Sequence, residues 1–146
     1  MRNPIHNPNG KQKSGEIMIV AIGIDIIEIE RIKLAMERSP HFLDRIMTAE
    51  EKEQIVQKGM RTSTVAGIFA GKEAVSKVLG TGIGKISWHD IQILTNHKGA
   101  PTVVLQGQAL LMAQELGIDE VLISIAHDQG KATASALGQK RQIQKG

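Results

Sequence analysis

Apolar and polar positions along the chain alternate between strand-like and helix-like periods. Residues 17–24 are apolar and rich in β-branched side chains on both faces, which predicts a buried strand. Apolar residues then recur at helical spacing over 28–38. The same criteria predict, in the rest of the chain, helices over 40–47, 48–59, 64–79 and 108–116, and strands over 88–95, 102–106, 120–126 and 131–137.

Local signals indicate where two of these helices begin. Thr48 and Glu51 have the spacing of a capping box, in which the two side chains satisfy backbone amides of the first turn. Ser39 is placed to cap the short helix that follows it, and Pro40 suits the first turn of that helix.

Two predicted hairpins decide the fold class. The turn 96–100 joins one pair of strands, and Asp128-Gln129-Gly130 joins the last pair. Because hairpins favour antiparallel pairing, we predict an α+β fold, with a mixed, mainly antiparallel sheet and packed helices. One domain is expected over 18–138. We interpret residues 1–17 as a disordered extension or an added tail, and 139–146 as a polar C-terminal tail.

The composition excludes several classes of protein. The chain has 146 residues and no cysteine, which excludes disulfide frameworks, thiolate metal sites and cysteine catalysis. Two Phe and one Trp are too few for an aromatic platform that stacks on single-stranded nucleic acid. No apolar run approaches the roughly 20 residues that span a bilayer, and no secretory signal is evident. We therefore expect a cytoplasmic protein that binds neither nucleic acid nor membrane.

The net charge of +3 does not describe the predicted domain. Of the 18 basic residues, six lie in 1–17 and 138–146, which leaves 12 basic and 14 acidic residues over 18–137. A basic surface for nucleic acid is therefore not supported by the folded part.

Two acidic residues are candidates for chemistry. Asp25 follows the first strand among isoleucines, where a carboxylate is costly unless a cation or donors meet it; a helix N-cap is an equal alternative. Glu73 and Lys77 are four residues apart on one helix face, and an ordinary ion pair explains that spacing fully. On spacing alone, the ion pair is the favoured interpretation of Glu73.

The remaining motifs are weaker. The glycine-rich stretch 80–84 follows a helix, unlike a dinucleotide-binding loop, and is predicted to be a helix end with a turn. His127 ends a strand, where a surface histidine is commoner than a metal ligand. Arginines recur every seven residues, as on a solvated face, at Arg31, Arg38 and Arg45. The motifs of serine hydrolases and zinc proteases do not occur.

The order of five motifs is more specific than any one of them. They are Ile-Gly-Ile-Asp-Ile-Ile-Glu at 22–28, Phe-Ala-Gly-Lys-Glu-Ala-Val-Ser-Lys at 69–77, Gly-Thr-Gly-Ile at 80–83, Asn-x-x-Gly-x-Pro at 96–101 and Ser-Ile-Ala-His at 124–127. In this order and spacing the chain resembles the holo-acyl-carrier-protein synthases, which are small stand-alone 4′-phosphopantetheinyl transferases. The resemblance covers about 18–137.

The resemblance implies a reaction and a metal. Phosphopantetheine would pass from coenzyme A to a serine of apo-acyl carrier protein, in support of fatty acid biosynthesis, and adenosine 3′,5′-bisphosphate would leave. A hard divalent cation held by carboxylates can neutralise a diphosphate, and Mg²⁺ prefers such sites. Asp25 and Glu73 match the metal-binding carboxylates of the family, and Lys77 lies one turn after Glu73, in reach of the same diphosphate. All three are expected to be catalytic.

The resemblance also implies binding residues and an assembly. Expected contacts of coenzyme A are Lys72, although it points elsewhere on the helix, and Lys77, Asn96, Gly99, Pro101 and His127. Arg31, Arg38 and Arg45 match the basic surface that binds the acidic carrier protein. The family implies a homotrimer with sites between subunits.

Three departures from the family pattern keep other functions open. Ile68 stands where arginine is usual, Ala126 replaces a serine, and Lys131 stands where an aromatic residue is common. One alternative is therefore a catalytically weak homologue that only binds coenzyme A or a carrier protein. Another is a structural α+β oligomer in which Glu73 and Lys77 form only a salt bridge.

Overall fold

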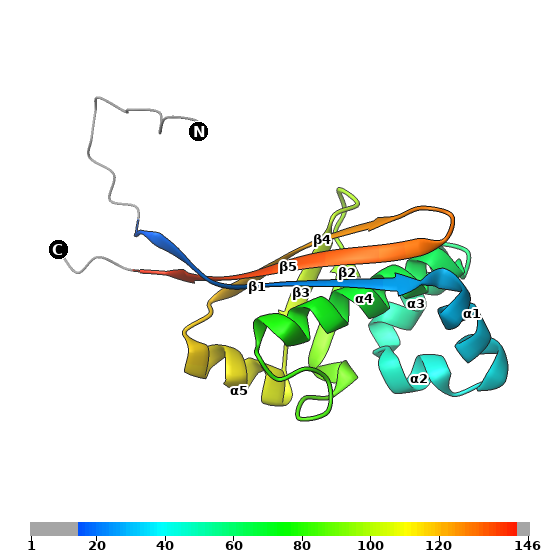
Figure 1. The fold of residues 1–146 in the computed structure, drawn as a ribbon, viewed down its shortest axis with the longest axis horizontal. Helices are drawn as coiled ribbons and strands as arrows, with labels where there is room; N and C mark the ends of the chain where they lie inside the picture. The colour runs from blue at the N-terminus through cyan, green and yellow to red at the C-terminus, as the bar shows by residue number, and fades with distance from the viewer. Residues whose placement is uncertain (1–14, 143–146) are drawn as a thin grey trace.

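The computed structural model describes residues 15–142 of the chain, so the predictions for 1–14 and 143–146 lie outside the described residues. A three-stranded sheet and a two-stranded sheet combine with five α-helices and one 3₁₀ turn (Figure 1). The elements, in chain order, are β1 (Ile17–Glu28), α1 (Ile29–Arg38), α2 (Phe42–Ile46), α3 (Ala49–Gln57), α4 (Thr62–Val78), η1 (Trp88–Asp90), β2 (Ile91–Thr95), β3 (Pro101–Leu105), α5 (Gly107–Leu116), β4 (Glu120–His127) and β5 (Lys131–Arg141). The predicted α+β class is confirmed.

The larger sheet is antiparallel throughout, with strand order β1-β5-β4. Its strands are longer than predicted. β1 continues to Glu28, and β5 continues to Arg141, where Ile17 pairs with Arg141 and Ile19 with Gln139. The predicted boundary of the C-terminal tail after residue 138 is therefore wrong, because residues 139–141 belong to the sheet.

The two faces of this sheet have different surroundings. Gly23, Asp25 and Ile27 face α4, which lies along one side of the sheet in Figure 1. The intervening isoleucines face the other way and keep large exposed fractions, at 74% for Ile22, 67% for Ile24 and 62% for Ile26. The prediction that β1 is buried on both faces is therefore wrong for a single chain.

Small residues let α4 lie close to the strands. A Cβ atom added to Gly71 would meet Ile93 Cδ1 at 2.7 Å, and one added to Gly67 would meet Ile125 Cγ2 at 2.8 Å. From the strand side, a Cβ on Gly23 would lie 2.2 Å from the carbonyl oxygen of Ala74. Larger side chains at these positions would push the helix off the sheet, and with it any group that the helix positions.

Helix starts and the smaller hairpin agree with prediction only in part. The capping box of Thr48 and Glu51 is confirmed. Ser39 instead ends α1, and α2 begins at Phe42 with His41 as N-cap, so the predicted cap is wrong. The β2–β3 hairpin is confirmed, but β2 begins at Ile91, because residues 88–90 form the turn η1.

Candidate functional site

The strand β1 and the helix α4 bring two acidic residues and one lysine together. Lys77 Nζ lies 3.2 Å from Asp25 Oδ1 and donates a hydrogen bond to the carbonyl oxygen of Ile24 at 2.7 Å. Glu73 lies one turn before Lys77 on the same helix. Burial, together with the charge of Asp25, raises the pKa of Glu73, and the charge of Lys77 opposes that shift. The carboxylates of Asp25 and Glu73 therefore lie near each other in a partly desolvated site between β1 and α4.

This geometry contradicts both structural interpretations of these residues. Asp25 lies inside β1 and does not cap a helix, since Glu28 occupies the N-cap position of α1. Lys77 forms its ion pair with Asp25, and no ion pair joins it to Glu73 within the described chain. The carboxylate of Glu73 is therefore left with a repulsive neighbour and no bonded cation.

The donor set fits a hard divalent cation. Between residues 15 and 142, no group of three or more His, Asp or Glu side chains gathers as a complete metal site. Two carboxylates are nevertheless the usual protein share of a Mg²⁺ site, because phosphate oxygens and water fill its other positions. A cation would also relieve the repulsion that raises the pKa of Glu73. Asp25 and Glu73 are the residues that would hold it.

A second candidate region is a pocket of about 270 Å³ at the beginning of α4. Three of the residues expected to contact coenzyme A line it, namely Gly99, Pro101 and His127. Ile68, which departs from the family pattern, also lines it, and residues that the sequence analysis did not single out complete the lining, namely Lys58, Ser63, Thr64, Gly67, Ile93, Thr95 and Ile125. Nothing in their spacing marks them as one site, because they come from α3, α4, β2 and β4 and meet only in the fold.

Two other residues expected to contact coenzyme A have side chains that form hydrogen bonds within the protein. The side-chain oxygen of Asn96 accepts hydrogen bonds from the backbone amides of Lys98 and Ala100, so it holds the turn between β2 and β3. Lys72 is fully buried, and its Nζ lies 2.7 Å from Glu51 Oε1 and 2.9 Å from the carbonyl oxygen of Trp88. The prediction that Lys72 contacts coenzyme A is therefore wrong, since its ammonium group is used inside the protein.

One chain does not bring the carboxylates and the pocket together. Successive residues of an α-helix turn by about 100°, so Glu73 and Ile68 are about 140° apart around α4. The pocket side of α4, at Gly67, packs against Ile125 of β4, whereas Lys77 packs against Gly23 of β1. His127 and Glu73 consequently belong to separate regions of the surface.

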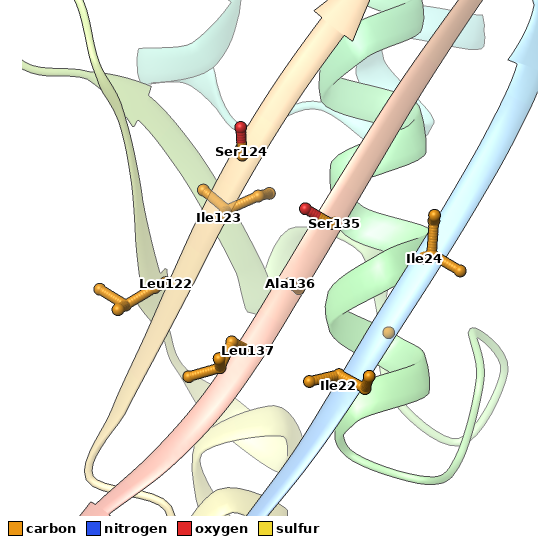
Figure 2. Close-up of a pocket in the computed structure, with 9 residues that line it drawn as sticks. Ile22, Ile24, Leu122, Ile123, Ser124, Ser135, Ala136 and Leu137 are labelled. Atoms are coloured by element: carbon orange, nitrogen blue, oxygen red, sulfur yellow. The ribbon is translucent and has the colours of Figure 1, made fainter. Parts of the chain in front are cut away.

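An apolar hollow lies on the face of the larger sheet that no helix from the described part of the chain covers. Figure 2 shows the side chains of Ile22, Ile24, Leu122 and Leu137 on its three strands. Ser124 and Ser135 are the only residues with polar side chains among those that line it. An exposed apolar surface of this kind typically marks a place where another protein binds.

The three arginines expected to bind a carrier protein lie on the first two helices. Arg31 and Arg38 belong to α1, and Arg45 belongs to α2. All three are exposed. The nearby Asp44 is paired with Lys52, which lowers the pKa of the Asp44 carboxyl and partly offsets its charge on this surface.

Comparisons with known proteins identify the family and the fold. A family model described as the 4′-phosphopantetheinyl transferase superfamily matches residues 21–136. The holo-[acyl-carrier-protein] synthase of Alkaliphilus metalliredigens is 47% identical over 120 residues, which cover 82% of this chain and 98% of that protein. The corresponding protein of Caldanaerobacter subterraneus subsp. tengcongensis is 48% identical over 123 residues, with coverage of 83% and 97%. The chain belongs to the 4′-phosphopantetheinyl transferase superfamily.

A solved structure of a superfamily member adds a ligand. Helicobacter pylori holo-[acyl-carrier-protein] synthase in complex with coenzyme A is 37% identical to this chain, with a TM-score of 0.72, and the match covers 81% of this chain and 99% of that chain.

None of the helices between residues 15 and 142 is long and apolar enough to cross a membrane.

The departures from the superfamily pattern fall at two kinds of position. Ile68 is only 9% exposed and contributes both to the core and to the lining of the pocket. Ala126 and Lys131 are exposed at the β4–β5 hairpin, on either side of His127 and its turn. None of the three replaces a member of the Asp25, Glu73 and Lys77 group.

Proposed function

We propose that this chain is a holo-acyl-carrier-protein synthase. It transfers 4′-phosphopantetheine from coenzyme A to a serine of apo-acyl carrier protein and thereby supports fatty acid biosynthesis. The observation that carries this proposal is the meeting of Asp25, Glu73 and Lys77 between β1 and α4, in a chain 47% identical to a protein of that name.

The reaction joins and breaks one bond each at the β-phosphorus of coenzyme A. The serine oxygen of the carrier bonds to that phosphorus and passes its proton to water, while the bond from phosphorus to the bridging oxygen breaks. Adenosine 3′,5′-bisphosphate leaves with that oxygen. A Mg²⁺ ion held by Asp25 and Glu73 would supply the positive charge that lets an alcohol approach a diphosphate.

Lys77 could exchange its contact with the Asp25 carboxylate for a contact with a phosphate group. In the free protein its ammonium group pairs with Asp25, and its side chain is 50% exposed. With a divalent cation held at Asp25, the ammonium group of Lys77 would be free to bind a phosphate oxygen of coenzyme A. Lys77 would then stabilise the negative charge that develops on the leaving phosphate.

We propose that a complete site needs two copies of the chain. The pocket containing Gly99, Pro101 and His127 and the carboxylates lie on different sides of α4, so a neighbouring copy would bring one group to the other. The exposed apolar face around Ile22 and Leu122 supports such an assembly, because association would remove it from water. The expected number of three subunits follows from the resemblance alone.

We further propose that Arg31, Arg38 and Arg45 receive the acidic carrier protein. Exposed arginines steer an acidic partner and orient it, and two of these arginines lie on α1, which directly follows the end of β1. The expected cytoplasmic location stays a prediction.

Mass spectrometry of apo-acyl carrier protein incubated with coenzyme A and Mg²⁺ tests the proposal. Transfer adds the mass of one phosphopantetheine group, and both Asp25→Ala and Glu73→Ala are expected to abolish that gain. Ile68 favours a second candidate, a homologue that binds without transfer, because an isoleucine cannot offer the charge of the usual arginine. That candidate predicts association without a gain in mass, and a purely structural oligomer predicts neither.

A further inference from the structure

The outer edge of β2 is satisfied by side chains of a helix. Within residues 15–142 the smaller sheet has two strands, and the edge of β2 opposite β3 has no strand of this described part beside it. Unpaired backbone groups on such an edge need other partners. Here α3 provides them. Glu51 Oε2 accepts from the amide of Ile93 at 2.9 Å, and Gln54 bonds both backbone groups of Thr95.

The contact between Gln54 and Thr95 has the form of one rung of a β-ladder. Gln54 Oε1 accepts from the Thr95 amide at 2.8 Å, and Gln54 Nε2 donates to the Thr95 carbonyl oxygen at 3.1 Å. A primary amide presents the same donor and acceptor as a peptide group, so one side chain replaces a residue of a third strand. The rung fixes the position and the direction of the strand at Thr95.

Thr95 is the residue from which the pocket wall extends. It is the last residue of β2, it lines the pocket, and the turn that follows carries Gly99 and Pro101 into the same lining. A two-stranded hairpin is only marginally stable by itself, so its end needs an external support. Gln54 gives that support from outside the pocket, since it is not among the residues that line it.

We propose that Gln54 is a positioning residue for the coenzyme A pocket, an inference that rests on the proposed function. By holding both backbone groups of Thr95, it keeps the wall formed by Gly99 and Pro101 in place before the ligand arrives. Without it, coenzyme A must order the hairpin end on binding, which weakens affinity. Because ground state and transition state need the same wall, the Michaelis constant for coenzyme A rises and kcat changes little.

Gln54→Met tests the proposal, since methionine has a similar shape and neither polar group. The matched control is Gln92→Met, which removes another glutamine contact between β2 and α3, to Glu50 Oε2 at 2.6 Å, away from the turn. Three quantities are measured, namely the Kd of coenzyme A by calorimetry, the steady-state constants, and hydrogen exchange of the Thr95 amide. We expect Gln54→Met to raise the Kd and KM roughly tenfold, with kcat within twofold and faster exchange at Thr95. Gln92→Met should leave all of these near wild type.

A second variant keeps the test decisive if Gln54→Met unfolds. Gln54→Glu retains an acceptor for the Thr95 amide but places a carboxylate against the Thr95 carbonyl oxygen, so it should also raise the Kd. An unchanged Kd in a folded variant whose Thr95 amide exchanges faster would overturn the proposal. Equal increases in Gln54→Met and Gln92→Met would also overturn it, because general packing of α3 would then suffice. Failure of the proposed function is a different result, in which wild type itself neither binds coenzyme A nor modifies the carrier.

Discussion

Removing the Lys72 ammonium group should destabilise the fold by a measurable amount. The group is fully buried and pairs with Glu51, also fully buried, at 2.7 Å. Lys72→Met leaves the Glu51 carboxylate without its cation, and breaking a buried pair from one side typically costs about 3–5 kcal/mol of the free energy of unfolding. Backbone amides of Thr48 and Ile93 still donate to that carboxylate, so we expect the lower end, about 3 kcal/mol.

Thermal denaturation measures this loss. About 1 kcal/mol corresponds to roughly 2–4 °C in a domain of this size, so the Tm should fall by roughly 6–12 °C. The double variant Lys72→Met/Glu51→Gln removes both charges and keeps an acceptor for the Ile93 amide. It should regain at least half of the loss, since an uncharged buried pair avoids the stranded carboxylate.

The opposite result would show that Lys72 does not act as a buried ion-pair partner. If Lys72→Met kept the wild-type Tm within about 2 °C while the KM for coenzyme A rose tenfold, Lys72 would be a ligand contact, as the sequence resemblance implied, and the buried pair would be unimportant for stability.

Three further results are expected. Glu73→Gln should abolish transfer and raise the Tm at pH 7. The folded-state pKa of Glu73 lies above its unfolded value of 4.5, so stability falls as the pH rises from that value through the folded pKa, and glutamine removes this loss; an unchanged or lower Tm would contradict it. Ile68→Arg should lower the KM for coenzyme A about tenfold through a charge-assisted contact, at some cost in Tm; a lower Tm with unchanged KM would show that position 68 serves only the core. Arg38→Glu should raise the KM for the carrier protein and leave that for coenzyme A unchanged; equal effects on both would argue against a carrier-binding surface.

Local signals explain why much of the fold could be predicted. The capping box of Thr48 and Glu51 and both hairpins depend on residues close in sequence, and these predictions are confirmed. Ser39 and Trp88 show where such signals fail. Residues 88–90 were predicted to begin a strand, but they form the 3₁₀ turn η1 before β2. Ser39 can cap the next helix only if the chain turns there, but its amide instead bonds back to Ala35 and ends α1.

The site was predictable as a set of residue types but not as a set of contacts. Glu73 and Lys77 have the spacing of an ion pair. Because α4 lies close to β1 at Gly23, however, Lys77 forms its ion pair with Asp25. Lys72 carries the positive charge expected of a phosphate contact. Its side chain nevertheless points into the core, where it pairs with Glu51. The partner of Gln54 lies 41 residues away, and no local pattern indicates it.

We propose that Asp25, Glu73 and Lys77 together carry out the transfer of phosphopantetheine by this chain. The most direct measurement is the mass of apo-acyl carrier protein after incubation with coenzyme A and either wild type or Glu73→Gln, each with Mg²⁺ and with a chelator. We expect a gain of one phosphopantetheine group only with wild type and Mg²⁺. An equal gain with Glu73→Gln, or no gain with wild type under any of these conditions, would contradict it.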